Sequence, residues 1–85
     1  LKPDNLSAYY NRGISKNSIQ DYNGAIEDYS EAIRLKPDYA IAYNARGNCK
    51  KTIQDYKGAI EDYSLAIKLK HDYPTAFYNR GISKS

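Results

Sequence analysis

The pentapeptide LKPDY at Leu35–Tyr39 lies within a sequence that repeats itself. The related pentapeptides LKPDN and LKHDY begin at positions 1 and 69, so the segment returns every 34 residues. A fixed period of this length is typical of proteins built from stacked structural repeats. Aligned on this period, residues 6–39 and 40–73 form two full units in which roughly two thirds of the positions are identical. The sequence therefore predicts a repeat array.

The ends of the chain follow the same period. Residues 1–5 match the tail of a preceding unit, and residues 74–85 match the first helix of a further one. The stretch YNRGISK at Tyr78–Lys84 repeats Tyr10–Lys16 without a change. We therefore expect a section of a longer array, with about five helices.

Each unit predicts two helices. Residues 6–19 contain no proline, and residues 22–36 carry an apolar stripe at the helical spacing i, i+3, i+4 and i+7. Pro37 is expected to end the second helix, while Asp21 and Asp38 are expected to cap the helices that follow them. The second helix is expected to turn Glu27, Asp28 and Glu31 to water. Its inward residues are expected to be Tyr22, Ala25, Ile26, Tyr29, Ala32 and Ile33.

Composition argues against several classes of protein. The formal net charge is only +3, from 13 basic and 10 acidic residues that are mixed along the chain, so no like-charged run marks a nucleic-acid tail. No apolar run approaches the roughly 18 residues of a membrane helix. The one cysteine allows no internal disulfide, which favours a reducing compartment such as the cytoplasm without fixing the localisation. No nucleic-acid or membrane partner is expected.

No catalytic or cofactor site is predicted. Cys49 and His71 suggest a thiol and its base, but Cys49 aligns with Ser15 and Ser83, which indicates a packed small side chain. Glu27 and its neighbour Asp28 diverge by about 100° around a helix, so they cannot flank one bond. His71 lacks the further ligands that a metal site needs. We expect neither an enzyme nor a metal or other cofactor.

The recurring small and aromatic residues resemble the pattern of the tetratricopeptide repeat (TPR) family. This resemblance implies an all-α fold, a right-handed α-solenoid of antiparallel helix pairs. It covers essentially the whole chain. The matching residues are Tyr9, Gly13, Ala25, Tyr29, Ala32 and Pro37, then Tyr43, Gly47, Ala59, Tyr63 and Ala66, then Phe77 and Gly81.

The chain departs from the family pattern at several recurring positions. Arginine replaces a leucine and lysine a tyrosine in every unit, and His71 replaces a proline. Gln20 and Gln54 stand where a turn glycine is common. The basic side chains are expected to lay their stems on apolar surface and extend their charged heads to water or to an acidic residue of the second helix. The basic residues are Arg12, Arg46, Arg80, Lys16, Lys50 and Lys84, and the acidic ones Glu27, Asp28, Glu61 and Asp62.

The family resemblance implies a non-catalytic scaffold that holds a peptide or protein segment in a concave groove lined by the first helix of each unit. Asparagine can donate to and accept from an extended backbone, and tyrosine offers a rigid contact. A solvated face remains the alternative. The predicted groove residues are Tyr10, Asn11, Ile14, Asn17, Ile41, Asn44, Asn48, Lys51, Thr75, Tyr78, Asn79 and Ile82.

Three further interpretations concern the ligand of the repeats, their family and their assembly. One TPR subfamily clamps a C-terminal carboxylate with asparagine and basic residues. Asn48 and Asn79 match its asparagines, but Asn44 stands where a lysine belongs, so the clamp is not supported within these residues. Pentatricopeptide repeats bind RNA but are one residue longer. The other alternative is self-assembly through the exposed repeat ends.

Overall fold

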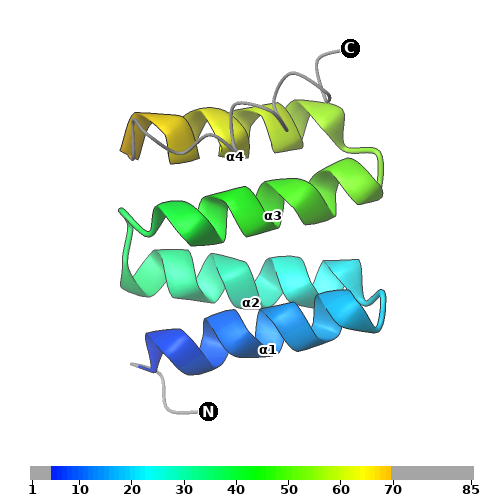
Figure 1. Cartoon of the computed structure of the whole chain (residues 1–85), viewed down its shortest axis with the longest axis vertical. Coiled ribbons are helices and arrows are strands. Elements are labelled where there is room, and N and C mark those ends of the chain that lie inside the picture. The colour runs from blue at the N-terminus through cyan, green and yellow to red at the C-terminus, as the bar shows by residue number, and fades with distance from the viewer. Residues whose placement is uncertain (1–4, 70–85) are drawn as a thin grey trace.

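The computed structural model describes residues 5–69, which form four α-helices. They are α1 (Leu6–Ser18), α2 (Tyr22–Leu35), α3 (Ala40–Thr52) and α4 (Tyr56–Leu69). Figure 1 shows them stacked in chain order, each antiparallel to the one before. The predicted all-α helical repeat is confirmed, and the predicted fifth helix at residues 74–85 lies outside the described residues.

Two helical hairpins form the stack. Helix α1 packs on α2 and α3 packs on α4, and the hairpins join where α2 meets α3. The core is built from small residues and two tyrosine rings, as the 3.6-residue periodicity predicts. The fully or almost fully buried apolar residues are Ala25, Tyr29, Ala32, Ala42, Cys49, Ala59, Tyr63 and Ala66.

Glycine allows the two helices of each hairpin to approach closely. A Cβ atom built on Gly13 would lie 2.6 Å from Cε1 of Tyr29, and one built on Gly47 would lie 2.8 Å from Cε1 of Tyr63. Real Cβ atoms do not come this close to a ring. The recurring glycine thus gives each tyrosine of the second helix room to lie across the first helix.

The capping residue predicted from the sequence is confirmed for α2 and is wrong for α3. Asp21 caps α2 by accepting from the backbone N–H of Gly24 at 3.1 Å. Asp38 was predicted to cap α3, and this prediction is wrong. The cap residue is Tyr39, which makes no capping hydrogen bond with its side chain. Asp38 instead pairs with Lys36 at 3.2 Å, because Pro37 and Asp38 form the turn that precedes the cap.

The turn inside each hairpin holds a glutamine in a left-handed conformation. Gln20 has φ 65° and Gln54 has φ 69°. The backbone N–H of the residue that follows the glutamine then points back along the helix. The N–H of Asp21, for example, donates to the carbonyl oxygen of Lys16 at 2.8 Å. Glycine is common here in the family because it adopts this φ without a steric penalty.

Glycine at either turn is therefore expected to stabilise the protein. Gln20→Gly removes a Cβ penalty of about 1 kcal/mol, part of which is offset by the greater freedom of the unfolded chain. Urea unfolding followed by circular dichroism should show that the free energy of unfolding rises by about 0.5 kcal/mol. The control Ser15→Gly, inside α1, should lower the free energy of unfolding by about 0.5 kcal/mol. A loss at both sites would contradict the assignment of a strained turn.

Candidate binding face

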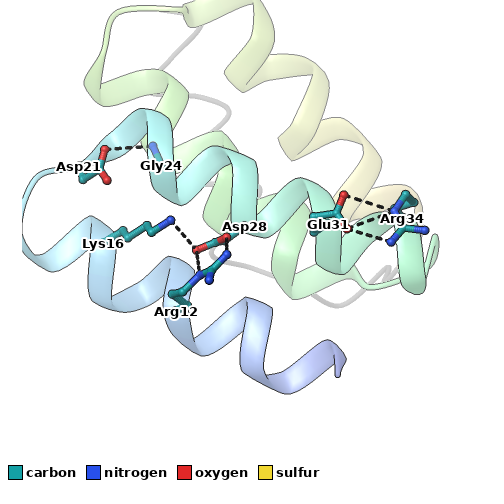
Figure 2. Close-up of polar contacts among 7 residues, drawn as sticks. All are labelled: Arg12, Lys16, Asp21, Gly24, Asp28, Glu31 and Arg34. Atoms are coloured by element: carbon teal, nitrogen blue, oxygen red, sulfur yellow. Dashed lines mark hydrogen bonds and ion pairs between the residues drawn. The ribbon is translucent and has the colours of Figure 1, made fainter. Parts of the chain in front are cut away.

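Each hairpin contains a buried carboxylate that holds two basic side chains. Asp28 was predicted to face water, and the structure shows this to be wrong, because Asp28 and its repeat equivalent Asp62 are at most 2% exposed. Figure 2 shows the first group. Arg12 donates to both oxygens of Asp28, at 2.8 and 2.7 Å, and Lys16 approaches the same carboxylate at 3.2 Å. Asp28 therefore links α2 to α1 through two cations.

The second hairpin repeats the arrangement and extends it to a third helix. Arg46 donates to both oxygens of Asp62 at 2.9 and 2.8 Å, and Lys50 lies 3.2 Å away. The remaining nitrogen of Arg46 donates to Oγ of Ser30 on α2 at 3.0 Å. Its guanidinium also lies 5.4 Å from the ring centre of Tyr43. This one arginine thus ties α3 to both of its neighbours.

These groups explain two departures from the family pattern. Arginine and lysine at the two recurring positions are matched by an aspartate on the second helix, so the charges are paired rather than simply solvated. The hydrogen bond from Arg12 is the main cause that lowers the pKa of Asp28, against a smaller opposing effect of burial. The hydrogen bond to Asp62 likewise raises the pKa of Arg46.

Acid is expected to weaken the fold through Asp28. The folded protein holds the pKa of this carboxyl below the value in the unfolded chain, so the unfolded chain binds the proton more readily. The contribution is complete above the ordinary aspartate value of about 4 and is lost as the pH falls through the lowered one. Urea midpoints should fall below about pH 4. The urea midpoint of the Asp28→Asn variant should fall less steeply with pH than that of the unchanged protein. The urea midpoint of the exposed control Glu27→Gln should fall as steeply as that of the unchanged protein. Equal slopes in all three proteins would contradict this assignment.

The predicted groove residues that the structure describes all lie on α1 and α3. Asn11, Ile14, Asn17 and Ile41 are exposed, and Tyr10, Asn48 and Lys51 are partly buried. Tyr10 is a packing residue as well, because its ring lies 5.6 Å from that of Tyr29 and 5.5 Å from that of Tyr39. The remaining members, Thr75, Tyr78, Asn79 and Ile82, lie outside the described residues.

One contact brings the two first helices together. Cys49 on α3 donates through its thiol to Oδ1 of Asn17 on α1, at 3.5 Å. The thiol is buried in the core beside Ala25 and Tyr29, and this burial raises its pKa to about 11. Cys49 therefore packs as a small, protonated side chain. Its contact places Asn17, one of the predicted groove residues, against α3.

Two asparagines of α3 are tied to the interior to different degrees. Asn48 accepts a hydrogen bond from the hydroxyl of Tyr63, so its carbonyl oxygen is turned toward α4. Asn44 was predicted to contact a peptide but is only 6% exposed, and among the described residues its Oδ1 has no hydrogen-bond partner. It takes the position of Tyr10 in the second repeat, which explains its burial. We therefore remove Asn44 from the residues expected to touch a ligand directly.

The described residues contain no grouping of three or more histidine, cysteine, aspartate or glutamate side chains that could hold a metal ion. Over residues 5–69, no helix combines the length and apolar character needed to cross a membrane. His71, which the sequence suggested as a partner for Cys49, lies outside the described residues.

The repeat period, the hairpins and the close glycine–tyrosine contacts are those of a known family. The sequence pattern of the TPR repeat matches residues 15–50 and 53–83. The chain belongs to the tetratricopeptide repeat family. Among curated proteins, no sequence matches it significantly.

Solved TPR structures are similar over nearly the whole chain. A crystal structure of MamA is 29% identical with a TM-score of 0.95, covering 98% of this chain and 48% of that one. The second TPR of Spaghetti (RPAP3), bound to the HSP90 peptide SRMEEVD, is 29% identical with a TM-score of 0.91, covering 93% of this chain and 73% of that one. The first TPR of Spaghetti, at 23% identity and TM-score 0.94, covers 98% and 66% and shares the fold. This TPR chain spans about half the length of the MamA chain.

Proposed function

We propose that this TPR chain is a non-catalytic scaffold that binds an extended peptide or protein segment along α1 and α3. We call this surface the groove face and define it by Tyr10, Asn11, Ile14, Asn17, Ile41, Asn48 and Lys51. The observation that carries the proposal is the contact between Asn17 and Cys49, because it brings a predicted groove residue of α1 against α3 of the next repeat. The similar second TPR of Spaghetti, which is bound to an HSP90 peptide, supports this class of partner.

The chemistry of the groove face suits an extended segment. Ile14 and Ile41 expose apolar side chains, with 41% and 43% of their surface open to solvent. The same two helices carry Asn11, Asn17 and Asn48, whose amides can bond to backbone groups. The buried small and aromatic residues of α2 and α4, in contrast, pack in the core. These two helices thus carry both apolar anchors and polar groups, as peptide-binding sites do.

The test is selection from a displayed library of short peptides, followed by affinity measurement with two matched variants. Ile14→Glu places a charge on the groove face, and Ile19→Glu places the same charge at the exposed hairpin turn, where the side chain is 76% open. The first should weaken binding of the selected peptide by about tenfold or more, and the second should leave it nearly unchanged. Equal losses in both variants, or no selected peptide despite intact helicity, would contradict the proposal.

A second candidate function is self-association through the repeat ends. The side chain of Arg46 is 17% exposed because α2 covers it, whereas that of the equivalent Arg12 is 45% exposed. At the last of the described helices, Ser64 and Leu65 line an open hollow on α3 and α4. Ser64 is the repeat equivalent of Ser30, which binds Arg46. The end surfaces therefore resemble the two halves of the α2–α3 contact.

Sedimentation over a wide concentration range tests this second function. A mass that rises with concentration, and falls back in Leu65→Lys but not in Ile53→Lys, would support association through the hollow. The two replaced side chains are similarly exposed, at 39% and 42%. A strictly monomeric chain at every concentration would exclude it.

A further inference from the structure

The face of α1 that corresponds to the packed face of α3 is open to solvent. Ala42 and Cys49 on α3 are buried, and Cys49 packs against residues of α2. The residues 34 positions earlier are Ala8, which is only partly buried, and Ser15, which is exposed. We call the surface of Ala8, Arg12 and Ser15 the end face of α1. It is the counterpart of the face with which α3 packs on α2.

Arg12 keeps one donor that Arg46 uses between the two repeats. Both arginines bind their aspartate through Nε and Nη2. Nη1 of Arg46 also donates to Oγ of Ser30 on α2. Nη1 of Arg12 has no hydrogen-bond partner within residues 5–69. Because the other two nitrogens are held by the aspartate and the guanidinium is planar, this free N–H group has a fixed direction on the end face of α1.

The hollow on α3 and α4 repeats the surface of α2 on which α3 packs. Ile60, Ser64 and Leu65 are among the residues that line it. Ser64 is the repeat equivalent of Ser30, which is the acceptor in the α2–α3 contact. Ile60 is the repeat equivalent of Ile26, which packs against the buried cluster that joins α2 to α3. The hollow therefore combines a hydroxyl acceptor with apolar side chains, as the end face of α1 requires.

The sequence of α1 also matches the neighbour that the repeat period places after α4. The stretch YNRGISK occurs at Tyr10–Lys16 and again at Tyr78–Lys84. The period therefore favours a first helix of this sequence as the neighbour of α4. In a second copy of the chain, this helix is already packed on α2, and Arg12 is held in place by Asp28. Docking of a second copy thus orders few additional groups.

We propose that copies of this chain dock head to tail, with the end face of α1 of one copy seated in the hollow on α3 and α4 of the next. Nη1 of Arg12 donates to Oγ of Ser64 in the next copy, as the equivalent arginine of α3 donates to Ser30 within one chain. The two surfaces differ, so each added copy leaves one of each open, and the assembly grows as a row instead of closing as a symmetric dimer. This inference rests on the second candidate function, self-association, and names its partner and its contact.

Complementation between two variants tests the geometry. Ser15→Glu places a charge on the end face of α1, and Leu65→Lys places one in the hollow. Each variant alone should associate about tenfold or more weakly than the unchanged chain in sedimentation. Mixed in equal amounts, the variants should form a complex of two copies that grows no further, because one intact end face and one intact hollow remain.

Three outcomes of this experiment would overturn the inference. If either variant alone associates as strongly as the unchanged chain, the contact is not head to tail. If the mixture stays monomeric while the unchanged chain associates, the copies meet through other surfaces. If the unchanged chain is monomeric at every concentration, the second candidate function fails together with this inference.

The hydrogen bond between copies is tested by Ser64→Ala, which removes the acceptor without adding a charge. Loss of this bond should weaken association by about fivefold. The matched change Ser30→Ala removes the equivalent acceptor inside the chain, so it should lower the urea midpoint and leave association unchanged. Association of Ser64→Ala at full strength would overturn the proposed contact.

Peptide binding and association should respond to different residues of α1. Ser15→Glu should weaken association and leave the affinity for a selected peptide unchanged, whereas Ile14→Glu on the groove face should do the reverse. Loss of association in Ile14→Glu but not in Ser15→Glu would overturn the inference, because the copies would then meet through the groove face.

Discussion

Asp62→Ala is expected to remove about 3 kcal/mol or more from the free energy of unfolding. The carboxylate is almost fully buried and accepts from Arg46 and Lys50, whose side chains are themselves mostly covered. Without it, two cations remain in a partly dry site with no counter-charge, and breaking such a group costs far more than a surface pair contributes. For a chain of this size the loss is a large share of the total stability. Urea unfolding followed by circular dichroism measures it.

Two comparisons make this prediction specific. Glu61→Ala removes an exposed carboxylate from the neighbouring position and should change stability by no more than about 0.5 kcal/mol. Asp28→Ala should destabilise less than Asp62→Ala, because Arg12 can turn toward water when its partner is lost, whereas Arg46 is covered by α2. Equal effects of Asp62→Ala and Glu61→Ala would contradict a structural role for the buried group.

Gly47→Ala is expected to destabilise the protein even though alanine favours a helix. The substitution gains about 1 kcal/mol of helix propensity. The new methyl group, however, would lie 2.8 Å from the ring of Tyr63, which is fully buried and bonded to Asn48. Overpacking of this kind costs about 1 to 3 kcal/mol, and here the ring has little room to move. We expect a net loss of about 1 to 2 kcal/mol in urea unfolding.

The control for the glycine prediction is Asn11→Ala. Asn11 lies exposed on α1, so alanine there should raise stability by a few tenths of a kcal/mol through helix propensity alone. If Gly47→Ala were as stabilising as this control, the close approach of α3 and α4 would not be the reason for the recurring glycine.

Sequence reasoning located the fold because the period and the spacing of small residues both recur. Gly13, Ala25 and Ala32 return 34 residues later, and each fits only a helix packed closely on another. The prediction of which residues are buried failed where it assigned a residue to the exposed face of a helix from its polarity alone. Asp28 was placed in water because it is acidic, although Arg12 and Lys16 stand at positions that the family fills with apolar residues. From the sequence alone, the partner of the basic heads was either water or one of four acidic residues. The 16-residue separation of Arg12 from Asp28 recurs in Arg46 and Asp62, and this signal would have singled out the pairs.

The candidate site was predicted less fully than the fold. Asn44 aligns with Tyr10 in the repeat, and both were predicted to contact a peptide. The structure packs the ring of Tyr10 beside Tyr29 and Tyr39 and buries Asn44, and the sequence alone did not show either role. The orientation of Asn17 and Asn48 depends on Cys49 and Tyr63, which are distant or on another helix. No local pattern contains that information, so the contacts of these two asparagines required the three-dimensional arrangement.

The most direct test of the groove face is to map a selected peptide onto the chain by amide chemical shifts in an NMR titration. The proposal predicts that the largest changes fall on α1 and α3, at Asn11, Asn17, Asn48 and Lys51. Changes concentrated on α2 and α4, or at the exposed hairpin turns around Ile19 and Ile53, would show that the peptide binds elsewhere and would contradict the account.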